Sequence, residues 1–576
     1  MKKFYTLVRI AVILLFTALI VELPDIGSAR SRTITPVNYL QNNNTINGNR
    51  VSEMIRNIRS GSSFNNVSLF SVSTKEEMGL NKYINNAIYL QLNQNNLNRI
   101  IEAKDNCVNF ILPTGNGKNI ELELARVNIL SGNFKLTATE KFGKEALDYK
   151  PGLYYRGIIK GDNNSVAAIS IFDDFVIGLI SNNDGNLVLC PQDKMLVNRN
   201  DYILYNDRDL LIKSGFKCGV GDNEDRFVRN TGKSINNIVN QNSDRLSKDT
   251  VMIFYVADYQ MYLDRGNNTA NFITAIFNNV ATLYQNESIP VNISGINVYR
   301  TEDPYASDTD SYQILLDFGY NTKDDFMGDL AQLLSTGHGQ ALGGIAYINV
   351  LCTPYNSSDY SGRYSFCNID NSFIPIYTYS WTVTVMTHEL GHNLGSYHTH
   401  SCHWPVLPYN GIGAIDSCYY AEGTCFYYLQ ANYNGTIMSY CHLIGAINLT
   451  LGFGPLPGDT IRSWYALASC IHSNENSSEL PAYYNLLQNY PNPFNPSTNI
   501  RFALPDDGFV TLAVYDITGR EVAKLLNGQF YTKGIYGYTI DANQYKMASG
   551  VYFYKLEVNR ENKNVYSEVK KMILIK

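Results

Sequence analysis

388-HELGHNLGSYH-398 is the stretch that decides the fold of the central part of this 576-residue chain. An apolar run, Trp381–Thr387, precedes it and predicts that it continues a helix. The four-residue spacing of His388 and His392 places both imidazoles on one helical face, one turn apart. Both side chains can therefore reach one metal ion.

The second half of the same stretch predicts a third ligand. Gly395 allows the chain to leave the helix with a positive φ, and this turn brings His398 back towards the first two histidines. Three neutral nitrogens leave zinc an open fourth position, as in a catalytic site. Glu389 follows the first ligand and can contact a zinc-bound water without binding the metal. The alternative is a core helix with incidental histidines, because the shorter HExxH pattern also occurs by chance.

The eleven-residue pattern resembles the signature of the metzincin metallopeptidases. That clan has a methionine-containing turn beneath its zinc, and Met438 in 435-GTIMSY-440 matches it in residue type and distance downstream. His400 and His403 do not match the ligand spacing, and we expect both at the surface of the following loop. The resemblance implies zinc as cofactor; calcium is possible, but no motif identifies a site for it.

Within the metzincins, the region from about 250 to 472 resembles the reprolysin (adamalysin) group. The stretch 344-GIAYINVLC-352 is similar to the edge strand and following cysteine of that family. The family also has a cysteine in its last helix, which Cys470 matches, so the resemblance implies a Cys352–Cys470 disulfide.

Two features depart from the reprolysin pattern. Tyr440 stands two residues after the turn methionine, where reprolysins have proline. Astacins and serralysins have tyrosine there, which implies zinc binding and transition-state stabilisation; the alternative is a buried phenol bonded to the backbone. The second departure is a set of four cysteines after His398. Their pairing is open, with Cys402–Cys441 and Cys418–Cys425 as one arrangement.

These residues predict peptide-bond hydrolysis by an endopeptidase. Zinc lowers the pKa of its bound water, and Glu389 takes the proton as general base and passes it to the leaving amine. An extended substrate would add a strand to the edge formed by Gly344, Ile345, Ala346 and Tyr347.

A built-in inhibitor is predicted upstream. The stretch 216-FKCGVGD-222 resembles the cysteine-switch segment of matrix metalloproteinase and reprolysin prodomains, which implies that Cys218 binds zinc in the latent form. A thiolate is a strong zinc ligand and would exclude the catalytic water. The alternative is a disulfide of Cys218 with Cys107 or Cys190. If Cys218 acts as the switch, Cys107 and Cys190 pair with each other or stay unpaired. Activation would need a cut between Gly219 and Lys248.

The chain is too long for one hydrophobic core, and its pattern predicts a multidomain protein. Short apolar runs separated by Asn/Gly turns predict a β-rich prodomain, 30–248, which ends in the switch and a polar connector. Alternating signals predict an α/β catalytic domain, 249–472, with a mixed sheet, helices at 270–284 and 325–334, and the active-site helix. A linker, 473–484, leads to a β-sandwich, 485–576.

Both ends of the chain carry export signals. Residues 1–29 have a basic start, a short apolar core and Gly27-Ser28-Ala29, which predict a cleavable signal peptide rather than a membrane anchor. Residues 489–522, with 549-SGVYFYKLE-557 and the terminal 570-KKMILIK-576, resemble the type IX secretion sorting domain. The alternative is a fibronectin-like adhesion sandwich. The resemblance implies the type IX machinery as partner and a secreted or surface-attached product of a Gram-negative bacterium.

Charge and composition argue against several other functions. A net charge of −6 gives no basic surface for nucleic acid, and no later stretch is apolar enough to span a bilayer. We expect a monomer that acts on proteins or peptides. A surface-binding protein that keeps the zinc domain as a scaffold is the second hypothesis, but a scaffold has no use for Glu389. A carbohydrate-binding exoprotein has no supporting motif.

Overall fold

The computed structural model describes most of the chain after residue 48. The described residues are 49–75, 79–192, 200–211, 218–221, 249–338, 343–369, 378–406, 411–425, 434–468, 470–471, 484–486, 489, 492–531, 534–560 and 563–575. The predicted signal peptide and most of the predicted connector lie outside these ranges. Among the described residues, no helix has the length and apolar character that crossing a bilayer requires.

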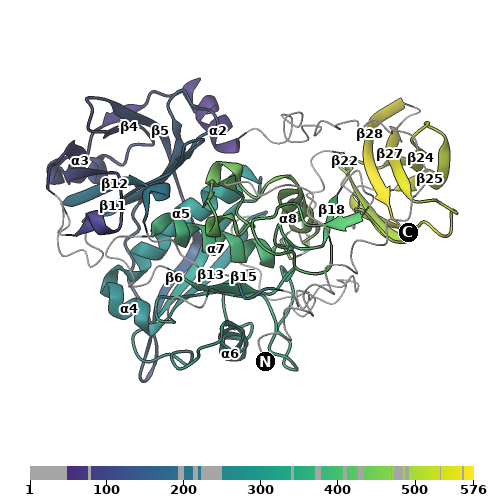
Figure 1. The fold of residues 1–576 in the computed structure, drawn as a ribbon. Coiled ribbons are helices and arrows are strands. Elements are labelled where there is room, and N and C mark those ends of the chain that lie inside the picture. The colour runs from purple at the N-terminus through teal and green to yellow at the C-terminus, as the bar shows by residue number, and fades with distance from the viewer. Residues whose placement is uncertain are drawn as a thin grey trace, which may run out of the picture. The chain divides into compact units, whose positions relative to one another are not determined.

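The N-terminal region is rich in strands, as predicted, and forms a ten-stranded sheet (Figure 1). Its order is β1 (Asn65–Val67), β4 (Cys107–Pro113), β5 (Asn119–Val127), β8 (Leu153–Ile159), β9 (Val166–Ile171), β10 (Val176–Asn182), β11 (Gly185–Pro191), β12 (Asp201–Asn206), β3 (Ala87–Leu92) and β2 (Phe70–Val72). Two helices, α2 (Arg50–Arg59) and α3 (Gln94–Ala103), accompany it. Tight turns set its antiparallel registers, as between β9 and β10, where Ile171 pairs with Val176.

The central region contains the predicted mixed sheet. Strands β13 (Val251–Ala257), β14 (Val291–Tyr299), β15 (Leu330–Ser335) and β17 (Tyr364–Asn368) run parallel, and β16 (Gly344–Ala346) is antiparallel to β17 at one edge. The helices are α4 (Tyr259–Arg265), α5 (Thr269–Asn286), α6 (Ser311–Thr322), α7 (Tyr379–Asn393) and α8 (Pro455–Leu467). In Figure 1, α5 and α7 lie on one side of β13 and β15, and α6 lies on the other.

A hairpin from the predicted prodomain extends this central sheet. Strand β6 (Leu130–Glu140) pairs in parallel with β14, and β7 (Gly143–Leu147) pairs with β6, so the sheet order is β16-β17-β15-β13-β14-β6-β7. The sequence pattern placed this hairpin in the prodomain. Its pairing partner could not be predicted, because alternation shows that a strand exists but not which sheet it joins.

The helix predicted at 325–334 is wrong. Residues Leu330–Ser335 form strand β15, which is fully buried between β13 and β17. A short apolar run has the same appearance in a buried strand and in a buried helix, and only its length distinguishes the two. The helix predicted at 270–284 is confirmed as α5.

Helix α7 runs through the core and is buried along nearly its whole length. It packs against α5, where Tyr284 donates its hydroxyl to the carbonyl of Thr387 at 2.9 Å. Its threonines fit a buried helix because their hydroxyls bond the carbonyls four residues earlier, as from Thr387 to Val383 at 2.7 Å. This packing fixes the helix that carries the first two histidines.

The C-terminal region consists of two sheets that share one hydrophobic core. The first has the order β22 (Asn485–Leu486), β23 (Ser497–Leu504), β26 (Gly534–Asp541), and the second β25 (Glu521–Tyr531), β24 (Gly508–Asp516), β27 (Gly550–Arg560), β28 (Lys563–Leu574). The predicted fold class, multidomain with a β-rich start, an α/β centre and a C-terminal sandwich, is confirmed.

Candidate metal centre

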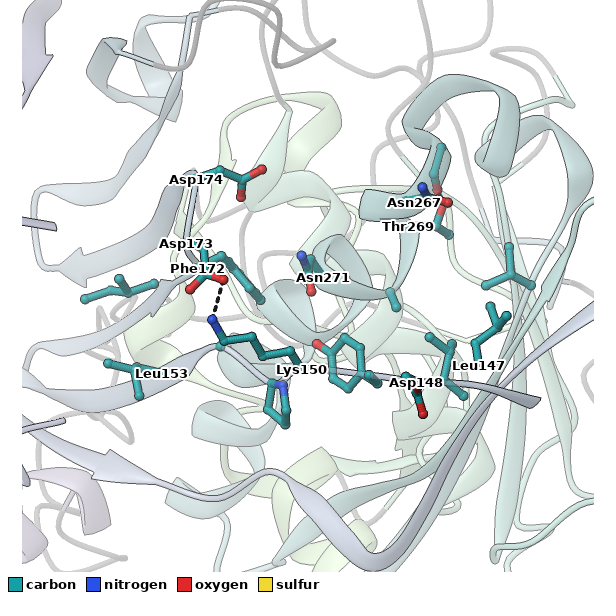
Figure 2. Close-up of a pocket in the computed structure, with 18 of the residues that line it drawn as sticks. Leu147, Asp148, Lys150, Leu153, Phe172, Asp173, Asp174, Asn267, Thr269 and Asn271 are labelled. Atoms are coloured by element: carbon teal, nitrogen blue, oxygen red, sulfur yellow. Dashed lines mark hydrogen bonds and ion pairs between the residues drawn. The ribbon is translucent and has the colours of Figure 1, made fainter. Parts of the chain in front are cut away.

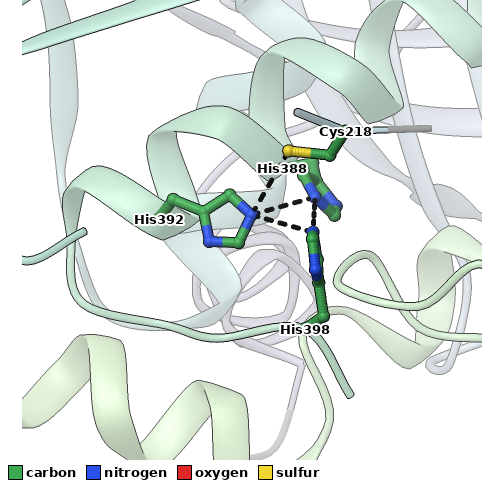
Figure 3. Close-up of side chains that lie close together, drawn as sticks. All are labelled: Cys218, His388, His392 and His398. Carbon is green, nitrogen blue, oxygen red and sulfur yellow. Dashed lines mark hydrogen bonds between the residues drawn. The ribbon is translucent and has the colours of Figure 1, made fainter. Parts of the chain in front are cut away.

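Three imidazoles converge on one point, as Figure 3 shows. The Nε2 atoms of His388, His392 and His398 lie 3.1–3.2 Å from one another. Nitrogens bound at about 2.0–2.1 Å to a tetrahedral zinc lie about 3.3 Å apart, so the spacing fits this ion. The structure thus brings the three predicted ligands together.

The other ring nitrogen of each histidine is held by an acceptor. Nδ1 of His388 donates to the carbonyl of Ile437 at 2.8 Å, and Nδ1 of His392 donates to the carbonyl of Ser396 at 2.7 Å. Because carbonyl oxygens only accept, the proton of each ring sits on Nδ1 and the lone pair sits on Nε2. The converging lone pairs repel one another unless a cation lies between them, which makes the donor set suitable for zinc.

The local sequence explains how His398 reaches the first two ligands. Helix α7 ends at Asn393, and Gly395 has φ of 99°, the positive value that the sequence predicted. Its amide donates to the carbonyl of His392 at 2.8 Å, which closes the turn. A Cβ at Gly395 would also lie 2.2 Å from the Trp464 ring, so the close packing of α8 requires glycine as well.

The predicted methionine turn lies directly against the metal-binding helix. Met438 is fully buried, and a Cβ on Gly391 would lie 2.8 Å from its sulfur. The turn also holds both ends of the ligand segment. Ile437 accepts from His388, and the Met438 carbonyl accepts from the amide of Thr399 at 3.1 Å.

Cys218 points its sulfur into the same cluster (Figure 3). Its Sγ lies 3.7 Å from Nε2 of His392, close to the roughly 3.6 Å expected between a sulfur and a nitrogen that share a tetrahedral zinc. All four donor atoms lie within 4.8 Å of one another. Two charged residues of the quoted segment, Lys217 and Asp222, lie outside the described residues.

Glu389 lies beside the cluster on α7, facing Cys218 and Gly344. It is buried, and the Cys218 thiol donates to its Oε2 at 3.5 Å. Gly344 on β16 leaves room for it, because a Cβ there would lie 2.2 Å from its Oε1. The glycine at the start of the predicted substrate strand therefore allows the carboxylate to approach the sheet edge.

Burial shifts the proton affinities of these groups. It lowers the pKa of His388 to about 4 and that of His392 well below its usual value, so both rings are neutral at neutral pH, as ligands must be. It raises the pKa of the Glu389 carboxyl and of the Cys218 thiol well above their usual values. A divalent cation at the imidazoles would oppose both increases, because it favours nearby negative charge.

Tyr440 is buried beside the three histidines but turns its hydroxyl to the backbone of Cys218. The phenol donates to the carbonyl of Cys218 at 3.2 Å, and the ring lies 4.9 Å from that of His398. The phenol is therefore bonded to the backbone, as in the alternative given in the sequence analysis. Its partner is the carbonyl of Cys218, the residue whose sulfur faces the three histidines.

The structure adds Glu422, which the sequence analysis did not find. Its carboxylate accepts from Nδ1 of His398 at 2.9 Å and from Nε2 of His400 at 3.2 Å. His400, expected at the surface, is fully buried, whereas His403 is exposed as predicted. His400 was misplaced because its ring packs beneath His398, at 5.0 Å and nearly parallel, and the ligand spacing gives no signal for such a contact.

The disulfides confirm one prediction and correct another. Cys352–Cys470 is present. The arrangement Cys402–Cys441 with Cys418–Cys425 is wrong, because the structure pairs Cys402 with Cys425 and Cys418 with Cys441. Sequence spacing cannot choose between such pairings. Cys218 forms no disulfide, and no disulfide joins Cys107 to Cys190.

A cavity of about 770 Å³ lies away from the histidines (Figure 2). Residues of the N-terminal region such as Lys150 and Phe172 line it together with Asn271 and Arg300 of the central region. None of the four metal-cluster residues contributes to its wall, so it is separate from the candidate centre.

Comparisons with known proteins agree with this geometry. A reprolysin-type model described as metallo-peptidase family M12 matches residues 247–448, and a secretion system C-terminal sorting domain model matches residues 488–575. The chain is similar to metalloproteinase-II from Bacteroides fragilis, with 12% identity over 58% of this chain and 90% of that one and a TM-score of 0.31.

A second similarity covers a small part of both proteins. Dimeric latent PorU from Porphyromonas gingivalis shares 27% identity over 16% of this chain, with a TM-score of 0.15, and the match spans 9% of the PorU chain. The two family models and the convergent histidines carry the assignment. Residues 247–448 therefore form a reprolysin-like metallopeptidase domain of family M12, and residues 488–575 form a type IX secretion C-terminal sorting domain.

Proposed function

We propose that this protein is a secreted zinc endopeptidase that is synthesised in a latent form. The observation that carries the proposal is the convergence of three imidazole lone pairs beside Glu389, with the Cys218 sulfur at the fourth position. His388, His392 and His398 would hold zinc, and Met438 would support them from beneath.

The chemistry divides between the ion and the chain. When bound, zinc supplies Lewis-acid chemistry that activates water and polarises the scissile carbonyl. Glu389 then serves as the general base, accepts the proton of the attacking water at its carboxylate, and gives it to the departing amine. Its burial suits this role, because a raised pKa brings a carboxyl closer to the working pH.

The edge at β16 is the proposed substrate platform. In the structure the amide of Gly219 donates to the carbonyl of Gly344 at 2.7 Å, so the prosegment already occupies a main-chain position there. A substrate strand would use the same carbonyl once the prosegment leaves. Ile345 and Ala346 continue the strand, whereas the Tyr347 carbonyl accepts from Asn393 and is less suited to a substrate.

Latency would arise because Cys218 takes the position that water needs. The domain plan is part of the proposal: signal peptide 1–29, prodomain 30–248, catalytic domain 249–472, linker 473–484 and sorting domain 485–576. Cleavage after Gly219 and before Lys248 would release the switch. The sorting domain supports export by the type IX machinery, with a secreted or surface-attached product.

The test combines metal analysis with a peptidase assay on the full chain after limited proteolysis. We expect one zinc per chain and cleavage of an unstructured protein substrate at internal bonds. Glu389→Gln should keep the zinc and lose activity by about 10³-fold, because only the general base is removed. His392→Asn should lose zinc, while His403→Asn, at an exposed histidine nearby, should retain both zinc and activity.

An intact parent protein without zinc would refute the metal centre. A zinc-loaded parent that cleaves nothing, or an active Glu389→Gln variant, would refute the proposed catalysis and leave the scaffold hypothesis.

A further inference from the structure

Glu422 is the one buried acid within hydrogen-bond distance of a zinc-ligand imidazole among the described residues. Both carboxylate oxygens lie 2.9 Å from Nδ1 of His398. The other two ligands, His388 and His392, donate instead to neutral main-chain carbonyls. The third ligand therefore differs from the other two in the charge of its partner.

The backbone on both sides holds Glu422 in place. Its amide donates to the carbonyl of His400 at 3.1 Å, and its carbonyl accepts from the amide of Cys402 at 3.0 Å. The Cys402–Cys425 disulfide joins the same two segments. The carboxylate is thus fixed by main-chain bonds and by a covalent link, independently of its own contact with His398.

His400 completes the arrangement. Its Nε2 lies 3.2 Å from Oε1 of Glu422, and its ring stacks on His398 with an interplanar angle of 6°. A buried carboxylate requires hydrogen-bond donors, and the two imidazole N–H groups supply them. His400 therefore holds the carboxylate that holds His398.

We propose that Glu422 is a positioning residue for the third zinc ligand, and that His400 keeps Glu422 in place. The inference rests on the proposed function, because it assumes that the three histidines bind zinc. The carboxylate keeps the His398 proton on Nδ1, directs the Nε2 lone pair to the metal, and increases the basicity of this ligand. Partners of this kind typically change metal affinity by about 10- to 100-fold.

The test measures zinc affinity by chelator competition in the full-length chain. Glu422→Ala should weaken zinc binding by about 10- to 100-fold. Glu422→Gln, which is nearly the same shape, should weaken it by about 10-fold, since it removes the charge but keeps an acceptor. Glu422→Asp should recover part of the loss if the carboxylate still reaches His398. His400→Phe, which keeps the stacking ring but lacks N–H, should lie between Gln and the parent.

Glu287→Gln is the matched control. Glu287 is also a buried carboxylate of the central region, ion-paired with Arg462, and its replacement should leave zinc affinity unchanged. Substituting Co²⁺ for zinc gives a second readout: the visible spectrum should change in Glu422→Gln and not in Glu287→Gln. If Glu422→Ala fails to fold, the Gln variant still decides the question.

Parent-like zinc affinity and an unchanged cobalt spectrum in folded Glu422→Gln would overturn the inference. Equal losses in Glu422→Gln and Glu287→Gln would also overturn it, since they would indicate general destabilisation. A parent chain that binds no zinc would refute the proposed function instead.

Discussion

The catalytic sheet has two edges, and residues upstream of the catalytic domain contact both in different ways. At the β14 edge, β6 pairs in register from Gly295 to Tyr299, and Asn297 adds hydrogen bonds to Thr137 and Thr139. At the β16 edge, residues 218–221 contribute the bond from Gly219 to Gly344 and the sulfur of Cys218. The first contact is a continuous ladder, and the second is a short contact at a metal cluster.

This difference indicates separate tasks for the two contacts. A ladder of main-chain bonds with buried side chains, such as Ala138 against Val298, belongs to the core of the sheet. A contact concentrated on one sulfur, one amide and one carbonyl can be lost without disturbing the sheet. We therefore expect latency to depend on the β16 edge and stability to depend on the β14 edge.

The largest effect should come from Cys218→Ala. A ligand tethered within the same chain has a high effective concentration at the metal, so its removal should raise activity before any proteolysis by about 10³-fold. The measurement is peptide hydrolysis by the uncut variant. Cys190→Ala, at a buried cysteine without a disulfide, is the control and should remain latent. A Cys218→Ala protein that stays latent would refute the switch.

Ala138→Glu tests the contact at the β14 edge independently of the contact at the β16 edge. Ala138 is fully buried in β6, and an unpaired carboxylate there should cost about 3 kcal/mol of unfolding free energy. Denaturant unfolding of the full chain measures this loss. Ala146→Glu makes the same change at an exposed position of β7 and should cost less than about 0.5 kcal/mol. Molecules of Ala138→Glu that fold should still be latent, and spontaneous activity would contradict the separation.

Acid should disrupt the contacts at the β16 edge before it disrupts the contacts at the β14 edge. The pKa of His388 falls from 6.5 when unfolded to about 4 in the fold, so the unfolded chain binds more protons between these values. This contribution, about 3 kcal/mol, is present above pH 6.5 and is lost as the pH falls towards 4. Protons also compete with zinc for the rings.

We therefore expect zinc release only as the pH falls to about 4 and below, where the folded His388 ring takes up a proton; a chelating dye measures this release. Amides of β6 and β14 should remain protected from hydrogen exchange there, because main-chain hydrogen bonds do not titrate. Simultaneous loss of zinc and of this protection would show that the two edges are coupled.

The smallest effect should come from Tyr440→Phe. Loss of its hydrogen bond to the Cys218 carbonyl should weaken the latent contact by about 1 kcal/mol, or about fivefold in basal activity. Tyr420→Phe, at an exposed tyrosine of the central region, should change nothing. After proteolytic activation, a further drop in kcat at constant KM for Tyr440→Phe would add a role in catalysis.

The sequence predicted the parts of the site that lie close together along the chain. His388, Glu389 and His392 follow helical spacing, and Gly395 predicts the turn to His398. Local backbone geometry therefore sets the positions of these three histidines and of the glutamate. Glu422 could not be found in this way. It lies in an irregular loop, and its contact depends on the Cys402–Cys425 disulfide, whose pairing spacing does not determine.

The same limit applies to the fold. Strand β15 was predicted as a helix because six buried residues carry no periodicity. The pairing of β6 with β14 was not predicted, because alternation does not identify a partner strand. Long amphipathic or strongly patterned elements such as α5 were predicted correctly. Elements whose identity depends on distant partners were not.

The two disulfides behind His398 also determine when the centre can mature. Cys402–Cys425 and Cys418–Cys441 enclose the segment that carries Glu422, and such bonds form outside a reducing cytoplasm. Until these thiols are oxidised, the loop that presents the carboxylate lacks its covalent links. We therefore expect completion of the proposed metal centre to depend on the cell compartment, so that a chain retained in the cytoplasm binds its metal less tightly than an exported one.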